Sequence, residues 1–116
     1  MIGYNLLIDI SGSKEPVDDL KTATKALAIV IVISKTTLIK TIFHTYKPHG
    51  LSISCIIKES HITYHTWPEY GYVSIDLFSC GEQLDTEKEL LICKRLKNLF
   101  DADNVSVNRF SRIVRK

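Results

Sequence analysis

The sequence predicts an α+β fold, a two-layer α/β sandwich in which a mainly antiparallel sheet carries two helices on one face. Three observations predict it. Short β-prone segments recur between turn residues, two longer segments have apolar residues at helical spacing, and 116 residues with a hydrophobic fraction of 45% suit one core of modest size. We therefore expect a single domain over residues 1–116.

The first half of the chain begins with a strand and a helix. Residues 4–10 are apolar and β-prone and end at a Ser-Gly-Ser cluster typical of a turn. A helix is expected from Glu15 to about Ser34, because Pro16 is tolerated in a first helical turn and Val17 opens a run of apolar residues at helical spacing. Residues 36–46 are rich in Thr and Ile and lead into a loop at 47–50, and another strand fits residues 51–58.

The second half continues with strands and closes with a helix and a strand. Residues 62–66 are β-prone, residues 67–71 form a loop, and residues 72–79 alternate as a half-buried strand does. Thr86 and Glu89 form a capping box that starts a helix, which ends at residues 101–104, before a last strand at 105–114. We expect the buried stripe of this helix to consist of Leu90, Leu91, Leu96, Leu99 and Phe100.

Such an architecture leaves one face of the sheet without helices. A second copy of the chain could cover it, and a solvated polar face is the alternative.

Composition argues against several classes of partner. A formal net charge of +2 is too small to predict nucleic-acid binding, and the longest apolar run, residues 26–33, is too short to cross a membrane. The three cysteines are an odd number with no close spacing, so the sequence predicts neither a disulfide framework nor a four-ligand zinc site. With no signal-peptide pattern at the N-terminus, we expect a cytoplasmic protein.

Polar residues gather in the centre of the chain. All four histidines lie between His44 and His65, and a solvated strand face would explain them without any function. A zinc site from His61, His65 and Cys80 is disfavoured, because histidines four apart pair on a helix and this segment is strand-like. A cysteine hydrolase with Cys80 and His65 is disfavoured as well, because no nucleophile turn surrounds the cysteine.

Two segments resemble a known family. KESHITYHTWPEYGY at 58–72, continued by DLFSCG at 76–81, closely resembles the processing-site region of prokaryotic S-adenosylmethionine decarboxylase proenzymes, and FHTYKPHGLS at 43–52 resembles the segment before that site. The resemblance implies a self-processing, pyruvoyl-dependent decarboxylase of the short dimeric class. Such an enzyme converts S-adenosylmethionine to its decarboxylated form, the aminopropyl donor of spermidine biosynthesis.

The resemblance also implies how the cofactor arises. The Ser60 hydroxyl would attack the carbonyl of Glu59 to form an ester, and elimination would then cut the chain into residues 1–59 and 60–116. Ser60 would become a pyruvoyl group, and neither a metal nor pyridoxal phosphate would be needed. The physical logic is that decarboxylation needs an electron sink, which a pyruvoyl group provides once it forms a Schiff base with the substrate amine.

Further roles follow from the same resemblance. Ser52 would hydrogen-bond the processing intermediate, His65 would move the proton for elimination, and Cys80 would protonate the substrate carbon after carbon dioxide leaves. Substrate binding is assigned to Tyr46, Trp67 and Glu69. Core packing is the alternative role for the two aromatic residues, and a small buried hydrophobe is the alternative for the cysteine.

The distances from Ser60 to the other expected site residues predict a homodimer. A hairpin closed by residues 67–71 puts Cys80 opposite Lys58, within a pair or two of Ser60. His65 lies five residues beyond Ser60, roughly 16 Å along an extended strand, so it could not touch its own Ser60. We therefore expect His65, with Ser52 and Tyr46, to come from the partner subunit, as the family is understood to build its sites.

The substrate is less firmly indicated than the chemistry. Asn5 stands where the family pattern has histidine, and Ile53 replaces a common glycine. Arginine or ornithine decarboxylation on the same scaffold therefore stays open, with Glu69 or Asp9 as a partner for a guanidinium group. A catalytically silent regulatory partner is the remaining alternative, and activation by a polyamine is not indicated either way.

Overall fold

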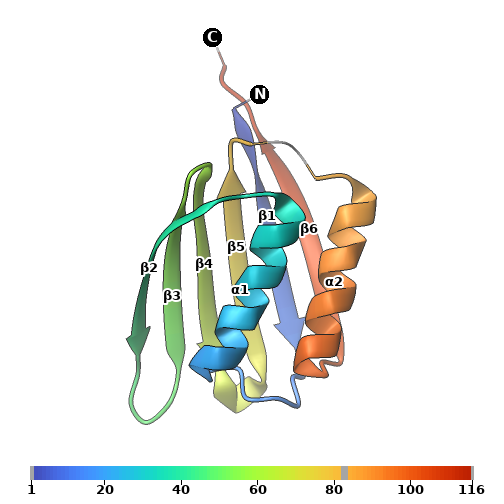
Figure 1. Cartoon of the computed structure of the whole chain (residues 1–116). Coiled ribbons are helices and arrows are strands. Elements are labelled where there is room, and N and C mark those ends of the chain that lie inside the picture. The colour runs from blue at the N-terminus through green and yellow to red at the C-terminus, as the bar shows by residue number, and fades with distance from the viewer. Residues whose placement is uncertain (1, 82–83, 116) are drawn as a thin grey trace.

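Alternating apolar residues form one sheet in the computed structural model, which describes residues 2–81 and 84–115. Its elements are β1 (Gly3–Ser11), α1 (Leu20–Ser34), β2 (Leu38–Thr45), β3 (Leu51–Ile57), β4 (Ser60–Trp67), the 3₁₀ helix η1 (Pro68–Tyr70), β5 (Tyr72–Ser79), α2 (Thr86–Phe100) and β6 (Asn104–Arg112). The sheet has six strands in the order β2-β3-β4-β5-β1-β6, and every neighbouring pair is antiparallel (Figure 1). The predicted fold class is confirmed.

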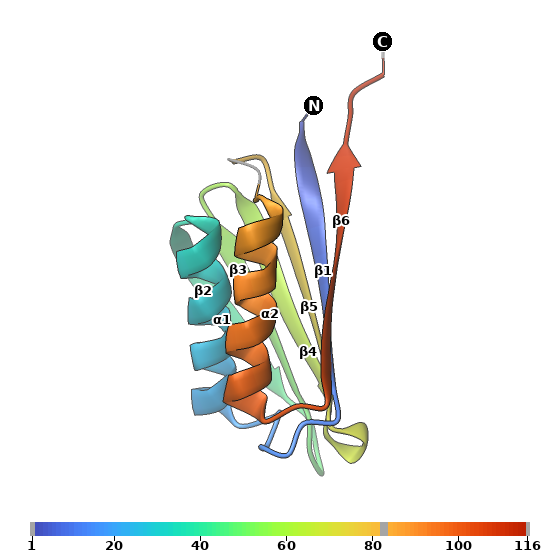
Figure 2. The same ribbon diagram turned by 90° about the vertical axis from the view of Figure 1, so that its right-hand side faces the viewer.

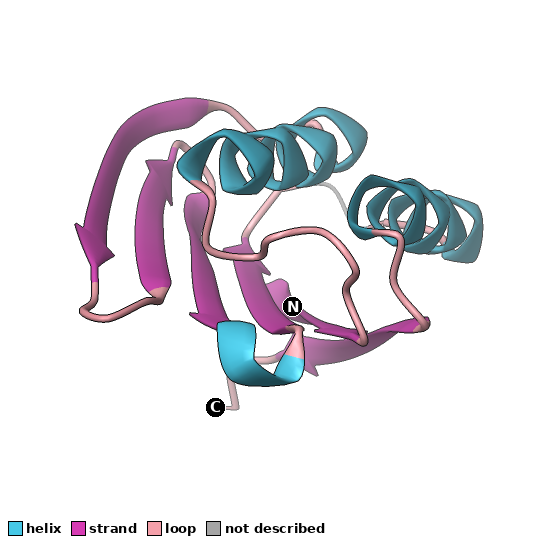
Figure 3. Ribbon diagram, turned by 90° about the horizontal axis from the view of Figure 1, so that it is seen from below, coloured by secondary structure: helices cyan, strands magenta, loops and turns pink. Residues whose placement is uncertain are grey.

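Both helices lie on the same face of the sheet, as Figures 2 and 3 show. The core fills the space between the layers, because every second residue in the middle of β1, β3, β4 and β5 points to the helices. Leu6 and Ile8 of β1, Tyr64 of β4 and Ile75 of β5 are buried there. Among the described residues no element covers the opposite face, and no helix is long and apolar enough to span a bilayer.

The helix boundaries differ from the sequence-based expectation. Helix α1 begins at Leu20 rather than near Pro16, because the Asp19 side chain caps it by accepting a hydrogen bond from the Thr22 N–H. Val17 lies before the helix and is buried, and its carbonyl accepts a 2.7 Å hydrogen bond from Tyr64. The segment before the helix therefore anchors the chain to the sheet.

The capping box expected for α2 is wrong, and the expected buried stripe is confirmed at Leu96 and Phe100 but not at Leu90 and Leu91. Asp85 is the N-cap and accepts a hydrogen bond from the Lys88 N–H, and Thr86 is the first helical residue. The buried positions are Ile92, Leu96 and Phe100, whereas Leu90 and Leu91 are exposed. The helix has apolar residues on more than one side, so spacing alone did not select the buried side.

The β4–β5 register differs by one residue from the expected pairing. Trp67 pairs with Tyr72, so η1 and Gly71 close a four-residue loop, and Ser60 pairs with Ser79. Cys80 consequently faces Glu59 and not Lys58, as its backbone N–H donates to the Glu59 carbonyl. This places Cys80 closer to the expected cleavage bond than the sequence suggested.

Candidate active site

The expected cleavage bond lies in the tight turn between β3 and β4. Ile57 pairs with Ser60, so Lys58 and Glu59 form a two-residue connection. Two-residue hairpins usually need a positive φ inside the turn to match the strand twist, but neither of these residues has one. Ser60 has a φ of 154°, a conformation that glycine adopts freely and that costs a residue with a side chain about 1–3 kcal/mol.

Backbone hydrogen bonds hold this turn in place. The Glu59 carbonyl, which belongs to the expected cleavage bond, accepts a 3.0 Å hydrogen bond from the Cys80 N–H. The Glu59 carboxylate accepts a 2.9 Å hydrogen bond from the N–H of Thr37, and the Thr37 carbonyl accepts one from Lys58 at 2.8 Å. An N–H already directed at this carbonyl can stabilise the oxyanion that forms when a nucleophile attacks the carbon.

The Ser60 hydroxyl has a histidine beside it. Its Oγ lies 3.4 Å from Nδ1 of His61, the next residue. The His61 ring packs edge-on against Phe78 of β5, with 5.8 Å between ring centroids, and the guanidinium of Arg112 lies 5.5 Å from the same Phe78 ring. Alternation along β4 and β5 places His61 and Phe78 on the sheet face that carries no helix, because the next residue of one strand and the previous residue of the other, Ile62 and Leu77, are buried.

Ser52, His65 and Tyr46 form a second group at the other end of the strands. Ser52 pairs with His65 across β3 and β4, and its Oγ lies 2.8 Å from His65 Nδ1. The Tyr46 hydroxyl lies 3.2 Å from the same Ser52 Oγ. Three of the expected site residues therefore form one hydrogen-bonded chain.

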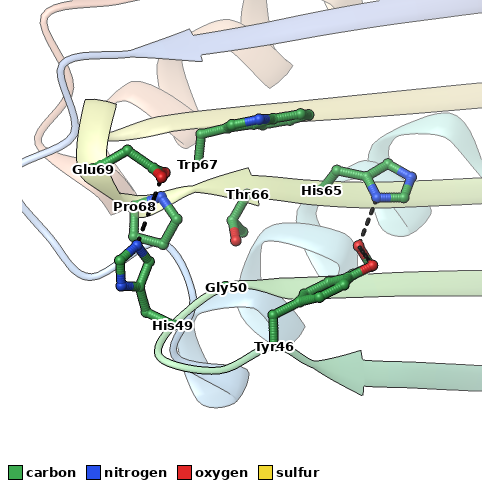
Figure 4. Close-up of a pocket in the computed structure, with 9 residues that line it drawn as sticks. Tyr46, His49, Gly50, His65, Thr66, Trp67, Pro68 and Glu69 are labelled. Carbon is green, nitrogen blue, oxygen red and sulfur yellow. Dashed lines mark hydrogen bonds and ion pairs between the residues drawn. The ribbon is translucent and has the colours of Figure 1, made fainter.

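This second group lines a pocket with a volume of about 280 Å³ (Figure 4). Trp67, Glu69 and His49 complete its wall, and His49 Nε2 lies 3.7 Å from a Glu69 carboxylate oxygen. The Trp67 ring packs against that of Tyr72, with 5.4 Å between centroids. Because small-molecule sites usually exceed roughly 300 Å³, this pocket suits part of a ligand.

The two groups lie at opposite ends of the sheet in Figure 1, one at the β3–β4 turn and the other beside η1. Ser60 and His65 are five residues apart in the extended strand β4, about 16 Å at ~3.3 Å per residue. Within one chain, His65 therefore makes no contact with the Ser60 hydroxyl.

The structure thus divides the sequence-predicted residues. Glu59, Ser60 and Cys80 meet at the turn, and the remaining five meet in the pocket: Tyr46, Ser52, His65, Trp67 and Glu69. Cys80 is exposed, unlike the buried Cys55, whose thiol pKa is raised by burial. An exposed Cys80 is accessible to a small molecule, so the buried-hydrophobe alternative is wrong for it.

Sequence reasoning missed the contact between Glu59 and Thr37. A backbone N–H that binds a distant carboxylate leaves no pattern in the sequence. The contact of His49 with Glu69 was missed too, although both residues stood in the motifs that carried the resemblance. Within residues 2–81 and 84–115, no three His, Cys, Asp or Glu side chains are arranged to hold a metal ion.

Known proteins are similar to this chain in sequence. The family model described as S-adenosylmethionine decarboxylase matches residues 4–113. An S-adenosylmethionine decarboxylase proenzyme of Acidithiobacillus ferrooxidans is 35% identical over 114 residues, 96% of this chain and 82% of the relative. One of Thermosipho melanesiensis is 38% identical over 84 residues, which are 72% of this chain and 65% of that protein.

A solved structure is similar in fold. It is the crystal structure of the adenosylmethionine decarboxylase from Aquifex aeolicus, with a TM-score of 0.77 and 22% sequence identity. The superposition covers 99% of this chain and 93% of that one.

Proposed function

Because the chain belongs to the S-adenosylmethionine decarboxylase family, we propose that it cuts itself between Glu59 and Ser60 and then decarboxylates S-adenosylmethionine. The cut yields residues 1–59 and 60–116, the second beginning with a pyruvoyl group made from Ser60. The observation that carries this proposal is the geometry of the Glu59–Ser60 bond. Its carbonyl accepts the Cys80 N–H, and its serine holds a φ of 154°.

The turn suits the first step of cleavage. Attack of the Ser60 Oγ on the Glu59 carbonyl carbon places negative charge on an oxygen that already accepts a backbone hydrogen bond. The backbone strain at Ser60 favours the reaction as well, because cleavage of the peptide bond removes the constraint on φ. These features fit the formation of a pyruvoyl group at this residue. That group would supply the electron sink that decarboxylation requires.

The second group supports a homodimer with shared sites. Ser52 and His65 are hydrogen-bonded to each other but lie about 16 Å from the serine of their own chain. A second copy on the helix-free face of the sheet could bring its own Ser52 and His65 to the Ser60 region. There Ser52 would hydrogen-bond the intermediate, and His65 would move the proton for elimination.

Mixing two inactive variants tests this sharing. Ser60→Ala chains and His65→Ala chains are mixed under conditions in which subunits exchange, and cleavage is followed by intact mass. We expect each variant alone to stay whole and the mixture to yield fragment 1–59 from the His65→Ala chains. Continued absence of fragments from verified mixed dimers would show that His65 acts within its own chain or has no such role.

The same arrangement supports roles for the remaining residues. The Cys80 thiol is exposed beside Glu59 and can donate a proton to the substrate carbon after carbon dioxide leaves. Tyr46 and Trp67 offer aromatic faces to an adenine ring and a sulfonium cation, and Glu69 offers a carboxylate. A cytoplasmic location is part of the proposal, because all three cysteines are free thiols and such thiols persist in a reducing compartment.

Release of labelled carbon dioxide tests the substrate. Purified protein is incubated until its mass is constant and then given carboxyl-labelled S-adenosylmethionine, arginine or ornithine. We expect release from S-adenosylmethionine, and none from the Ser60→Ala variant. Release from arginine alone would reassign the substrate, and a cut chain without turnover of any of the three would favour the silent regulatory partner.

A further inference from the structure

We propose that His61 is the base that removes the proton from the Ser60 hydroxyl in the first step of self-cleavage. The inference rests on the proposed function, since it concerns the same Glu59–Ser60 bond. It assigns a chemical role to a histidine that the family resemblance left without one.

The geometry at the turn carries the inference. Neighbouring side chains of a regular strand point to opposite faces of the sheet, so a contact between residues 60 and 61 is not expected. Here the Ser60 Oγ lies 3.4 Å from His61 Nδ1, and Ser60 departs from regular strand geometry with its φ of 154°. Catalytic hydrogen bonds are commonly long before the reaction and shorten as the proton moves, so this distance suits a base.

The His61 ring is also held in position. It packs edge-on against Phe78, whose ring lies 5.5 Å from the Arg112 guanidinium carbon, and Arg112 donates a 2.6 Å hydrogen bond to Asn5. A chain of contacts from β6 to β4 thus restrains the imidazole beside the serine. Pre-positioning of this kind is what an efficient proton acceptor requires.

Groups already at the turn can accept the proton and the electron pair that move in this step. As the Ser60 Oγ bonds to the Glu59 carbonyl carbon, its proton moves to His61 Nδ1, and the carbonyl electron pair moves to the oxygen held by the Cys80 N–H. When the tetrahedral intermediate collapses, the C–N bond breaks, and the same proton passes from His61 to the departing Ser60 nitrogen. The product is an ester with a free amine, and no other reactant is consumed.

His65 does not compete for this step within its own chain. Its Nδ1 is hydrogen-bonded to Ser52 at the other end of the strand. The two histidines therefore divide the reaction, with His61 acting before the ester forms and His65 of the proposed partner acting after it. This division can be measured, because an ester reacts with hydroxylamine and a peptide bond does not under mild conditions.

The test compares three histidine variants and one control variant with the wild-type chain, each purified whole and followed by intact mass with and without hydroxylamine. In His61→Ala and His61→Asn we expect cleavage to slow by about 100-fold or more, with no hydroxylamine-labile ester. Asparagine keeps a polar group near the Nδ1 position but accepts no proton, so it separates proton transfer from packing. In His65→Ala we expect the ester to accumulate.

Thr63→Ala is the matched control, because Thr63 lies on the same strand and the same face as His61 and pairs with Ser54 and Asp76. We expect this variant to cleave at the wild-type rate. Cleavage of either His61 variant at the wild-type rate, or accumulation of ester in either, would overturn the role of His61 while leaving self-cleavage intact. A wild-type chain that is never cut would instead overturn the proposed function itself.

Discussion

The positive φ of Ser60 predicts an unusual order of stability for two substitutions. Replacing a residue inside a strand by glycine normally destabilises a protein relative to alanine, because glycine has more freedom in the unfolded chain. At Ser60 the φ of 154° reverses this expectation, since a Cβ is strained in that conformation and glycine is not. Neither Ser60→Ala nor Ser60→Gly retains a hydroxyl, so both chains stay uncut and can be compared directly.

The magnitude follows from two opposing contributions. Removing the Cβ should relieve about 1–3 kcal/mol of strain, and the added freedom of the unfolded chain should cost roughly 0.5–1 kcal/mol. We therefore expect Ser60→Gly to exceed Ser60→Ala by about 1 kcal/mol in free energy of unfolding, or a Tm higher by about 4 °C.

Urea denaturation monitored by circular dichroism measures this difference. Thr63 provides the reference position, because it lies in the same strand and has no positive φ. There we expect the ordinary order, with Thr63→Gly less stable than Thr63→Ala. If Ser60→Gly is also less stable than Ser60→Ala by roughly 1 kcal/mol, the turn stores no strain and cannot promote cleavage in this way.

Three further predictions follow from single contacts. The hydrogen bond to Asp9 raises the pKa of Tyr72 to about 12. This residue therefore adds stability below pH 10 that is lost as the pH rises through 12. Ultraviolet titration should show that Asp9→Asn lowers the pKa of Tyr72, and an unchanged pKa would refute the contact. Tyr64→Phe removes the buried hydrogen bond to Val17 and should lower the free energy of unfolding, measured by urea denaturation, by about 1–2 kcal/mol. An unchanged denaturation midpoint would show that this hydrogen bond adds no stability. Cys80→Ala keeps the backbone N–H that binds the Glu59 carbonyl, so gels should show near-normal cleavage. Carbon dioxide release should fall, because the thiol that protonates the substrate is gone. A variant chain that stays whole would show that the thiol also has a role in cleavage.

The strands were predictable from sequence where one face is buried. Residues 72–79 alternate between apolar and polar, and β5 occupies the same range, because a strand between other strands buries every second side chain. Helix boundaries were less predictable. Both Asp85 and Thr86 can cap a helix, and the choice depends on which oxygen reaches the Lys88 N–H in the folded chain.

The residues of the candidate site could be predicted from the sequence, but their contacts with one another could not. The motifs indicated Ser52 and His65 as site residues. The 2.8 Å contact between Ser52 Oγ and His65 Nδ1 depends on the β3–β4 register, which is set by the length of the turn. The contact of His61 with Ser60 depends on a positive φ at Ser60. This conformation could not be predicted from the residue type, since serine rarely has a positive φ. Such local strain is visible only when the turn is folded.

The most direct test of self-cleavage is the mass of the chain over time. Freshly purified and aged protein is analysed by intact mass spectrometry, with Ser60→Ala as the uncut control. We predict two fragments that divide between Glu59 and Ser60, the second carrying a carbonyl-reactive pyruvoyl group in place of its serine. A wild-type chain that keeps its full mass throughout, like the control, would show that the chain does not cleave itself.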